Sequence, residues 1–137
     1  MIEKNRYIIN NFPSSRQATI DIGYLGLRKH HIKALIELDV THARELIKNY
    51  RNQKKEEISF TAGMIGNVKG WVIPVSFLPV CFALGSIVKK PGVFKERIEV
   101  REYLQMTILI DHDVIDGAPA ARFVTRLTDL IESGHGM

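Results

Sequence analysis

The sequence contains little of what disulfide-stabilised or membrane-spanning proteins are built from. Its 137 residues include one cysteine, Cys81, so no internal disulfide can form, and its place in an apolar run is typical of a small buried hydrophobe. No long hydrophobic run is present, because Pro74, Pro79 and Gly85 interrupt the apolar stretch at residues 71–88. No long apolar segment follows the first charges of the N-terminus. We therefore expect a cytoplasmic protein that makes no contact with a membrane.

The sequence also lacks a concentrated charge of one sign. The formal net charge is +4, and the basic residues come in short groups such as Arg28-Lys29 and Lys54-Lys55, close to acidic or apolar residues. A surface that binds nucleic acid would need a denser basic cluster, so we expect no nucleic-acid partner. The length and the 45% hydrophobic content suit one domain over residues 1–137, whose core needs no structural metal.

What is present is an ordered succession of strand and helix patterns. Alternation of apolar and polar residues predicts a half-buried strand over residues 29–40. Thr41 then fits the N-cap of an amphipathic helix that ends near Gln53. Short buried strands are predicted at residues 71–76 and 80–88, with a Pro-Gly turn at residues 89–92.

A long strand over residues 97–110 and a final helix complete the pattern. Pro119 fits the first turn of that helix, and Gly134 suits its C-terminal cap. The segment Asp111-His-Asp-Val-Ile-Asp-Gly117 lies between the two, where a strand ends and a loop leads into a helix. Functional side chains are common at such places.

Three interpretations of this loop follow from its residues alone. A histidine beside carboxylates can act as a general base near neutral pH, because negative charge favours the imidazolium and can orient the ring. Asp111, His112 and Asp113 also offer ligands to a divalent metal ion. A solvated turn without chemistry is the third interpretation.

The residues around His112 resemble the signature of a known family. The stretch Ile108-Leu-Ile-Asp-His-Asp-Val-Ile-Asp-Gly-Ala-Pro-Ala-Ala-Arg-Phe123 is similar to that of the CoA-dependent acyltransferases, which include the catalytic core of dihydrolipoyl acyltransferases and chloramphenicol acetyltransferase. The signature is a histidine, three residues, Asp-Gly, and then a helix that begins with Ala and Ala-Arg-Phe. Residues 29–41, 70–74 and 83–91 resemble further strands of that core, and Asp113 after the histidine is typical of a stand-alone subgroup.

The resemblance implies an α/β fold in which a mixed β-sheet packs against helices, as in chloramphenicol acetyltransferase. The chain passes almost directly from one family segment to a later one near Ala62, so part of the middle of the domain is expected to be missing. By this resemblance, we expect the lipoyl and subunit-binding domains of full-length relatives to be absent and no lipoyl group to be carried by this chain.

The resemblance also implies roles for particular residues. His112 corresponds to the general base and Asp116 to a structural carboxylate paired with an arginine, either Arg16 or Arg28. Thr61, or Ser59 next, would donate a hydrogen bond to the oxyanion. The residues expected to contact the cofactor are Gly117, Ser86 and His31, with His30 as an alternative to His31.

The activity that follows from the resemblance is transfer of an acyl group between coenzyme A and a thiol such as dihydrolipoamide. The implied partners are acyl-CoA, the thiol acceptor, components of a 2-oxo acid dehydrogenase, and two further copies of the chain in a homotrimer. Two alternatives remain: a non-catalytic oligomerising remnant of the same fold, and a metal-binding module at Asp111, His112 and Asp113.

Overall fold

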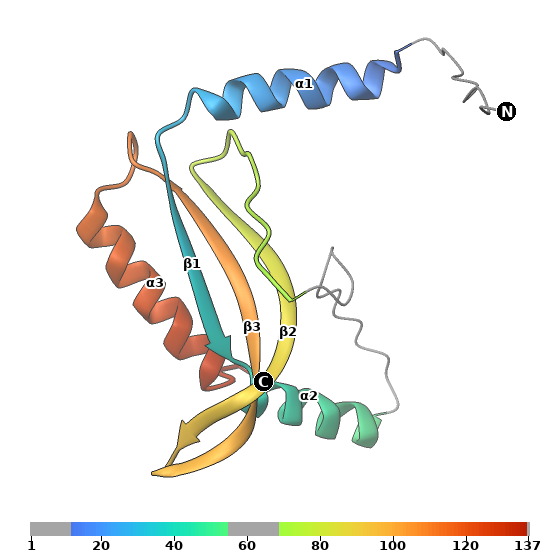
Figure 1. Ribbon diagram of the computed structural model, residues 1–137, viewed down its shortest axis with the longest axis vertical. Coiled ribbons are helices and arrows are strands. Elements are labelled where there is room, and N and C mark those ends of the chain that lie inside the picture. The colour runs from blue at the N-terminus through green and yellow to red at the C-terminus, as the bar shows by residue number, and fades with distance from the viewer. Residues whose placement is uncertain (1–11, 55–68, 137) are drawn as a thin grey trace, which may run out of the picture.

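The computed structural model describes residues 12–54 and 69–136, which form three helices and three strands (Figure 1). In chain order the elements are α1 (Ser14–Leu27), β1 (His31–Asp39), α2 (Thr41–Lys54), β2 (Val80–Phe94), β3 (Arg97–Asp111) and α3 (Gly117–Glu132). The expected internal junction near Ala62, together with Thr61 and Ser59, lies outside the described residues.

The three strands form one sheet in the order β1-β3-β2, with β3 in the centre. Along β1, His31 lies opposite Asp111 and Asp39 opposite Tyr103, while β2 forms a long hairpin with β3. The expected α/β class and the packing of a sheet against helices are confirmed. Both pairings are antiparallel, so the described strands do not include the parallel pair that a mixed sheet would contain.

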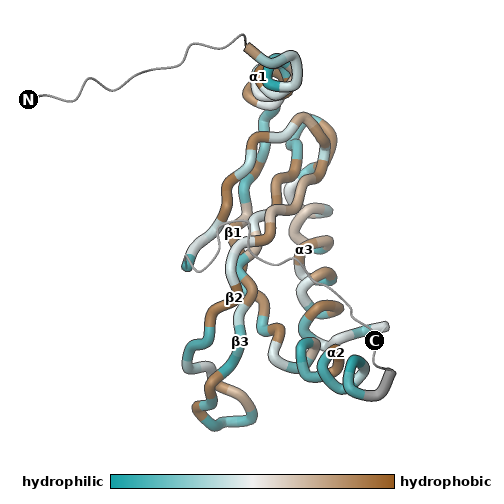
Figure 2. The backbone as a smooth tube through the Cα atoms, turned by 90° about the vertical axis from the view of Figure 1, so that its right-hand side faces the viewer, coloured by the Kyte–Doolittle hydropathy of each residue, from teal (hydrophilic) through white to brown (hydrophobic). Residues whose placement is uncertain are grey.

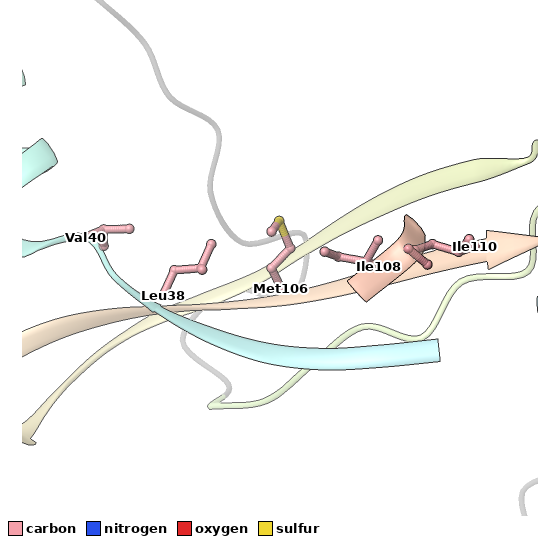
Figure 3. Close-up of a cluster of buried hydrophobic side chains, with 6 residues drawn as sticks. Leu38, Val40, Met106, Ile108 and Ile110 are labelled. Carbon is pink, nitrogen blue, oxygen red and sulfur yellow. The ribbon is translucent and has the colours of Figure 1, made fainter. Parts of the chain in front are cut away.

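The hydrophobic core lies between α3 and one face of the sheet. Alternation along β1 and β3 directs Leu38, Met106, Ile108 and Ile110 to this face, and the first turn of α3 adds Ala120 (Figure 3). Figure 2 shows α3 running beside the sheet along much of its length. The apolar stripe predicted for the last helix is confirmed, since three of its residues pack on this core: Val124, Leu127 and Ile131.

The predicted end of α3 is also confirmed. Gly134 adopts a left-handed backbone conformation with φ of +64°, which glycine tolerates without steric cost. Its N–H donates to the carbonyl of Ile131, and the N–H of His135 donates to the carbonyl of Leu130. These two bonds form a Schellman motif, which satisfies carbonyls that a helix end leaves free.

At the start of α2, the predicted cap was wrong by one position. Thr41 is already helical, and the carbonyl of Val40 accepts the hydrogen bond from the N–H of Arg44. The carboxylate of Asp39 accepts bonds from the N–H and hydroxyl of Thr41, at 3.0 and 2.6 Å, and one from the guanidinium of Arg101 at 2.8 Å. Burial alone would raise the pKa of Asp39, but these bonds and the charge of Arg101 lower it.

Two local predictions in the middle of the chain were wrong. Residues 71–77 form no strand, because side chains provide their contacts: the indole N–H of Trp71 donates to the carbonyl of Ile36, and the N–H of Gly70 to Ser86 Oγ. The expected turn at residues 89–92 is part of β2, which continues to Phe94. Proline is tolerated there because β2 is an edge strand.

Helix α1 was not predicted, and it extends away from the sheet (Figure 1). The only buried residue in it is Gly26, where an added Cβ would lie 2.7 Å from the carbonyl oxygen of Ser76. Its larger apolar side chains are exposed, including Tyr24, Leu25 and Leu27. Among the described residues, no helix is long and apolar enough to cross a membrane.

Candidate active site

His112 lies in the turn that joins the central strand to α3. β3 ends at Asp111, residues 112–115 form the turn, and α3 begins at Gly117. The side chain of His112 is exposed, and its backbone N–H donates to the carbonyl of His30 at 3.0 Å. The structure therefore holds this histidine by its main chain and leaves its imidazole accessible.

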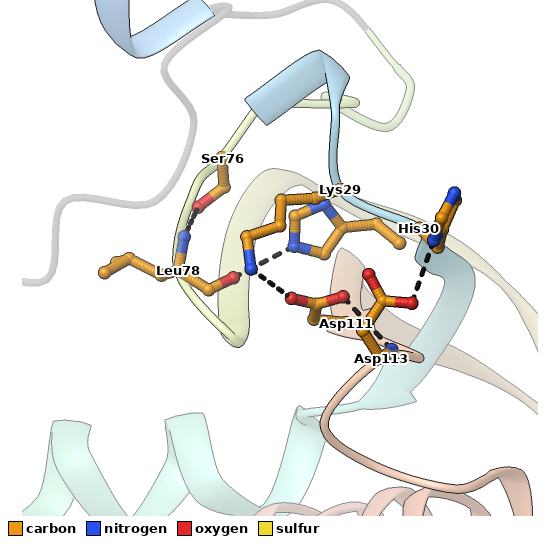
Figure 4. A network of polar contacts seen from close by, with 7 residues as sticks. Lys29, His30, Ser76, Leu78, Asp111 and Asp113 are labelled. Carbon is orange, nitrogen blue, oxygen red and sulfur yellow. Dashed lines mark hydrogen bonds and ion pairs between the residues drawn. The ribbon is translucent and has the colours of Figure 1, made fainter. Parts of the chain in front are cut away.

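Asp111 organises the turn from a fully buried position. Its Oδ2 binds the ammonium of Lys29 at 2.8 Å, and its Oδ1 accepts the N–H of Asp113 at 3.3 Å (Figure 4). Its backbone carbonyl accepts the N–H groups of Val114 and Ile115, and its own N–H donates to Pro79. The hydrogen bond from Lys29 lowers the pKa of Asp111 against the opposing effect of burial, and the same pairing raises the pKa of Lys29.

This depressed pKa predicts a dependence of stability on acid pH. A carboxyl whose folded-state pKa lies below its ordinary value of 3.8 stabilises the fold above that pH, and the contribution is lost as the pH falls through the folded-state pKa. Between about pH 5 and pH 2, urea midpoints of wild type should therefore fall more steeply than those of Asp111→Asn, which keeps an acceptor oxygen. Parallel midpoint curves for the two proteins would contradict this.

Asp113 makes the second side-chain contact of the turn. Its Oδ1 lies 2.8 Å from Nδ1 of His30, and both side chains are well exposed. The hydrogen bond to Asp113, followed by the charges of Asp113 and Asp111, raises the pKa of His30. The pair is therefore an ion pair at lower pH and becomes a neutral–charged contact as the pH rises.

These contacts correct one step of the sequence argument. Asp111 and Asp113 flank His112, but their carboxylates bind Lys29 and His30, and the imidazole of His112 has no hydrogen-bond partner among the described residues. The described part of the chain also contains no group of three His, Cys, Asp or Glu side chains arranged to hold a metal ion. The metal-binding interpretation consequently has no geometric support here.

Asp116 and Gly117 lie where α3 begins. Asp116 is the N-cap residue, and its backbone carbonyl accepts the N–H of Ala120 while its side chain makes no capping bond. Neither Arg16 nor Arg28 forms an ion pair with Asp116 in the part of the chain that the structure describes. Gly117 has open space where a Cβ would lie.

The remaining predicted residues lie at different distances from His112. His31 pairs with Asp111 across β1 and β3, and its Nε2 lies 2.9 Å from the carbonyl oxygen of Leu78. Ser86 is buried and donates to Oε1 of Gln105 at 2.8 Å. Gln105 precedes Asp111 by six residues on β3, which is about 20 Å of strand. The structure therefore brings His31 close to the turn and leaves Ser86 far from it.

Lys29 is the residue of this site that the sequence argument missed. It precedes β1 by two positions and reaches a carboxylate 82 residues later in the chain. A buried carboxylate at the end of a strand requires a cation or several donors, so Asp111 was a signal that a partner exists. Only the antiparallel pairing of β1 with β3 identifies that partner as Lys29.

The segment that contains the His112 turn matches a known protein family. Residues 78–137, which contain β2, β3, the His112 turn and α3, match the sequence profile of the 2-oxoacid dehydrogenases acyltransferase (catalytic domain). This C-terminal part of the chain is therefore similar to the acyltransferase catalytic domain. The resemblance inferred from the His112 segment is thereby confirmed.

Two curated proteins similar to this chain are both named dihydrolipoyllysine-residue acetyltransferase component of pyruvate dehydrogenase complex. The one from Corynebacterium glutamicum is 38% identical over 55 residues, which cover 37% of this chain and 8% of the relative. The one from Acholeplasma laidlawii is 35% identical over 48 residues, covering 35% of this chain and 9% of the relative. The matched part of the chain thus spans less than a tenth of the length of either relative.

Two solved structures share the acyltransferase fold with this chain. A probable dihydrolipoamide acetyltransferase from Listeria monocytogenes has a TM-score of 0.68 at 13% identity, covering 98% of this chain and 97% of that one. A dihydrolipoamide acetyltransferase from Azotobacter vinelandii has a TM-score of 0.67 at 12% identity, covering 91% and 92%. At these identities the likeness establishes the fold alone.

Proposed function

We propose that this protein is an acyltransferase that moves an acyl group between coenzyme A and a thiol such as dihydrolipoamide, with His112 as its general base. The observation that carries the proposal is the placement of His112. Its backbone is bound to the carbonyl of His30, its imidazole is exposed, and it lies in the segment that matches the acyltransferase catalytic domain.

The spacing of the family's catalytic groups supports this assignment. The Azotobacter structure was determined to examine the role of a serine, a histidine and an asparagine in the catalytic mechanism, and that asparagine follows the histidine by four residues. His112 and Asp116 have the same spacing in this chain. We therefore assign them the corresponding positions, with Asp116 as a structural carboxylate.

The chemistry required of His112 is a proton transfer in each direction. A ring nitrogen of neutral His112 takes the proton from the attacking thiol, and the thiolate sulfur forms a bond to the carbonyl carbon of acyl-CoA. The tetrahedral intermediate then breaks the bond to the sulfur of CoA, which leaves with the proton held by the imidazolium. The product is the acylated acceptor and free CoA.

The intermediate carries a negative oxygen that needs a hydrogen-bond donor. Removing one such donor typically raises the barrier by about 3–4 kcal/mol. We assign this role to Thr61, with Ser59 as the next candidate, and both lie outside the described residues. For substrate binding we retain His31 and Gly117, which lie near the His112 turn, and assign Ser86 no direct contact with the reacting atoms.

Exposed apolar side chains support assembly of the protein into an oligomer, for which we propose a homotrimer. One group lies on α1 and includes Tyr24 and Leu27, and another lies at the far end of the β2–β3 hairpin. In the hairpin group, Val93 lies opposite Ile98 and Pro91 opposite Val100, so these residues share one face. Exposed apolar patches of this kind mark interaction surfaces.

The same apolar surfaces favour a second candidate function. A remnant that retained the sheet and its subunit contacts but lost the substrate channel would assemble without catalysing transfer. Three predictions accompany the proposal: the chain forms a single catalytic domain, the protein is cytoplasmic, and it associates with other components of a 2-oxo acid dehydrogenase.

The proposed function is tested by acyl transfer in solution. Purified protein is incubated with acetyl-CoA and dihydrolipoamide, and free CoA and the acetylated acceptor are quantified by mass spectrometry against a blank without protein. We expect both products to form in equal amounts and in proportion to protein concentration. If several acyl-CoAs give only the blank rate while the protein forms a defined oligomer, the non-catalytic alternative is correct.

A further inference from the structure

Two consecutive residues, Lys29 and His30, each bind one of the carboxylates on either side of His112 (Figure 4). The ammonium of Lys29 lies 2.8 Å from Oδ2 of Asp111, and Nδ1 of His30 lies 2.8 Å from Oδ1 of Asp113. Figure 4 shows the side chains of Lys29 and His30 approaching the turn from different sides.

Main-chain bonds complete this arrangement. The N–H of His112 donates to the carbonyl of His30, so the residue that binds Asp113 through its side chain also binds His112 through its backbone. The carbonyl of Asp111 holds the next part of the turn through Val114 and Ile115. Every residue from 111 to 113 is thus bound directly to the segment that leads into β1.

The imidazole of His112 has no hydrogen-bond partner of its own among the described residues. Its direction is consequently determined by the backbone of the turn, and a general base must lie within hydrogen-bond reach of the proton that it removes. We propose that Lys29 and His30 are positioning residues, which clamp Asp111 and Asp113 and so direct the imidazole of His112 toward the attacking thiol. This inference rests on the proposed role of His112 as the base.

The two contacts of the clamp differ in burial. Asp111 has no exposed surface and the side chain of Lys29 is 35% exposed, so this pair is shielded from solvent on the carboxylate side. His30 and Asp113 are 77% and 52% exposed, so their attraction is screened and individually weak. The contact of Lys29 with Asp111 therefore contributes more to holding the His112 turn in place than the contact of His30 with Asp113.

Protonation of His30 makes the second contact dependent on pH. The charged groups facing His30 are Asp113 and Asp111 at the end of β3, and the adjacent ammonium of Lys29 is already bound by Asp111. Deprotonation of His30 removes the positive partner of Asp113 as the pH rises, whereas His112 must be neutral to accept a proton. The rate should therefore decline at high pH as His30 deprotonates and this contact weakens.

Steady-state kinetics of three variants test the clamp. Because small misplacements of a catalytic group cost up to about a hundredfold, Lys29→Met should lower kcat about ten- to a hundredfold with an unchanged KM for acetyl-CoA. Lys29→Arg should recover most of that loss, since it keeps the charge. His30→Gln should lower kcat about two- to fivefold, the range of an exposed ion pair, and abolish the decline at high pH.

A double variant separates positioning from neutralisation of a buried charge. Lys29→Met alone leaves the carboxylate of Asp111 buried without a cation, which can prevent folding. Combining it with Asp111→Asn removes that charge, so the protein should fold while kcat stays low. Wild-type kcat in the double variant, or in Lys29→Met itself, would overturn the proposal.

Hydrogen exchange tests the clamp without relying on activity. Amide protons of residues 113–115 should exchange at least several-fold faster in the double variant than in wild type, with unchanged exchange in α3. If exchange is faster in the double variant but wild type transfers no acyl group, the clamp stands and only the role of His112 is refuted. Unchanged exchange in the turn would overturn the clamp even if wild type is active.

Discussion

Replacing His112 by alanine is expected to lower the rate of acyl transfer by about 10²–10⁴-fold, the usual contribution of a positioned general base. Without the imidazole, the acceptor thiol has no group to remove its proton during attack on the thioester. The loss should appear in kcat, because His112 acts on the reacting proton and not on the remainder of coenzyme A. Free CoA, followed over time with acetyl-CoA and dihydrolipoamide, measures the effect.

The matched control for this substitution is His135→Ala. His135 is exposed after the end of α3, and its structural contact is made by its backbone N–H, which alanine retains. Its rate should remain within about twofold of wild type. If His112→Ala and His135→Ala both transfer the acyl group at the wild-type rate, His112 is not the base.

The second large effect concerns stability. Ile108 is fully buried at the centre of the core between β3 and α3, so Ile108→Ala should leave a cavity that the surrounding side chains fill only in part (Figure 3). Such substitutions cost about 2–5 kcal/mol of unfolding free energy. Urea unfolding at one protein concentration should show a lower midpoint with an unchanged slope.

Ile108→Val provides the graded comparison, because it removes one methyl group and keeps the branched shape that suits a strand. Its expected cost is about 0.5–1.5 kcal/mol. A midpoint for Ile108→Ala equal to that of Ile108→Val would show that the face of the sheet beneath α3 is not the main core of the protein in solution.

The segment at residues 69–79 connects the core to the site without forming a strand. Trp71 binds the backbone of β1 at Ile36, and further along the segment the carbonyls of Leu78 and Pro79 bind His31 and Asp111. It thereby closes the face of the sheet opposite α3 near the His112 turn. Its conformation depends on indole and imidazole contacts with other elements, which explains why a local pattern of apolar residues predicted a strand there.

Local sequence patterns were sufficient to predict several helices and strands, because the residues that determine these elements are close together in the sequence. The alternation at residues 29–40 predicted β1, and the apolar stripe with Gly134 predicted α3 and its end. Pro91 and Gly92 gave a wrong prediction of a turn, since a turn and an edge strand tolerate the same residues. Edge position is a property of the sheet and depends on which strand pairs with which.

The sequence by itself determined the core-facing residues of β1, β3 and α3, the position of His112 between a strand and a helix, and the similarity of the His112 segment to the acyltransferase catalytic domain. All of these depend on periodicity or on a contiguous motif. The tertiary structure alone decided that Asp111 and Asp113 bind Lys29 and His30 and leave the imidazole of His112 free. These partners are 82 and 83 residues apart in the chain and meet because β1 and β3 pair antiparallel, an arrangement that no local pattern specifies.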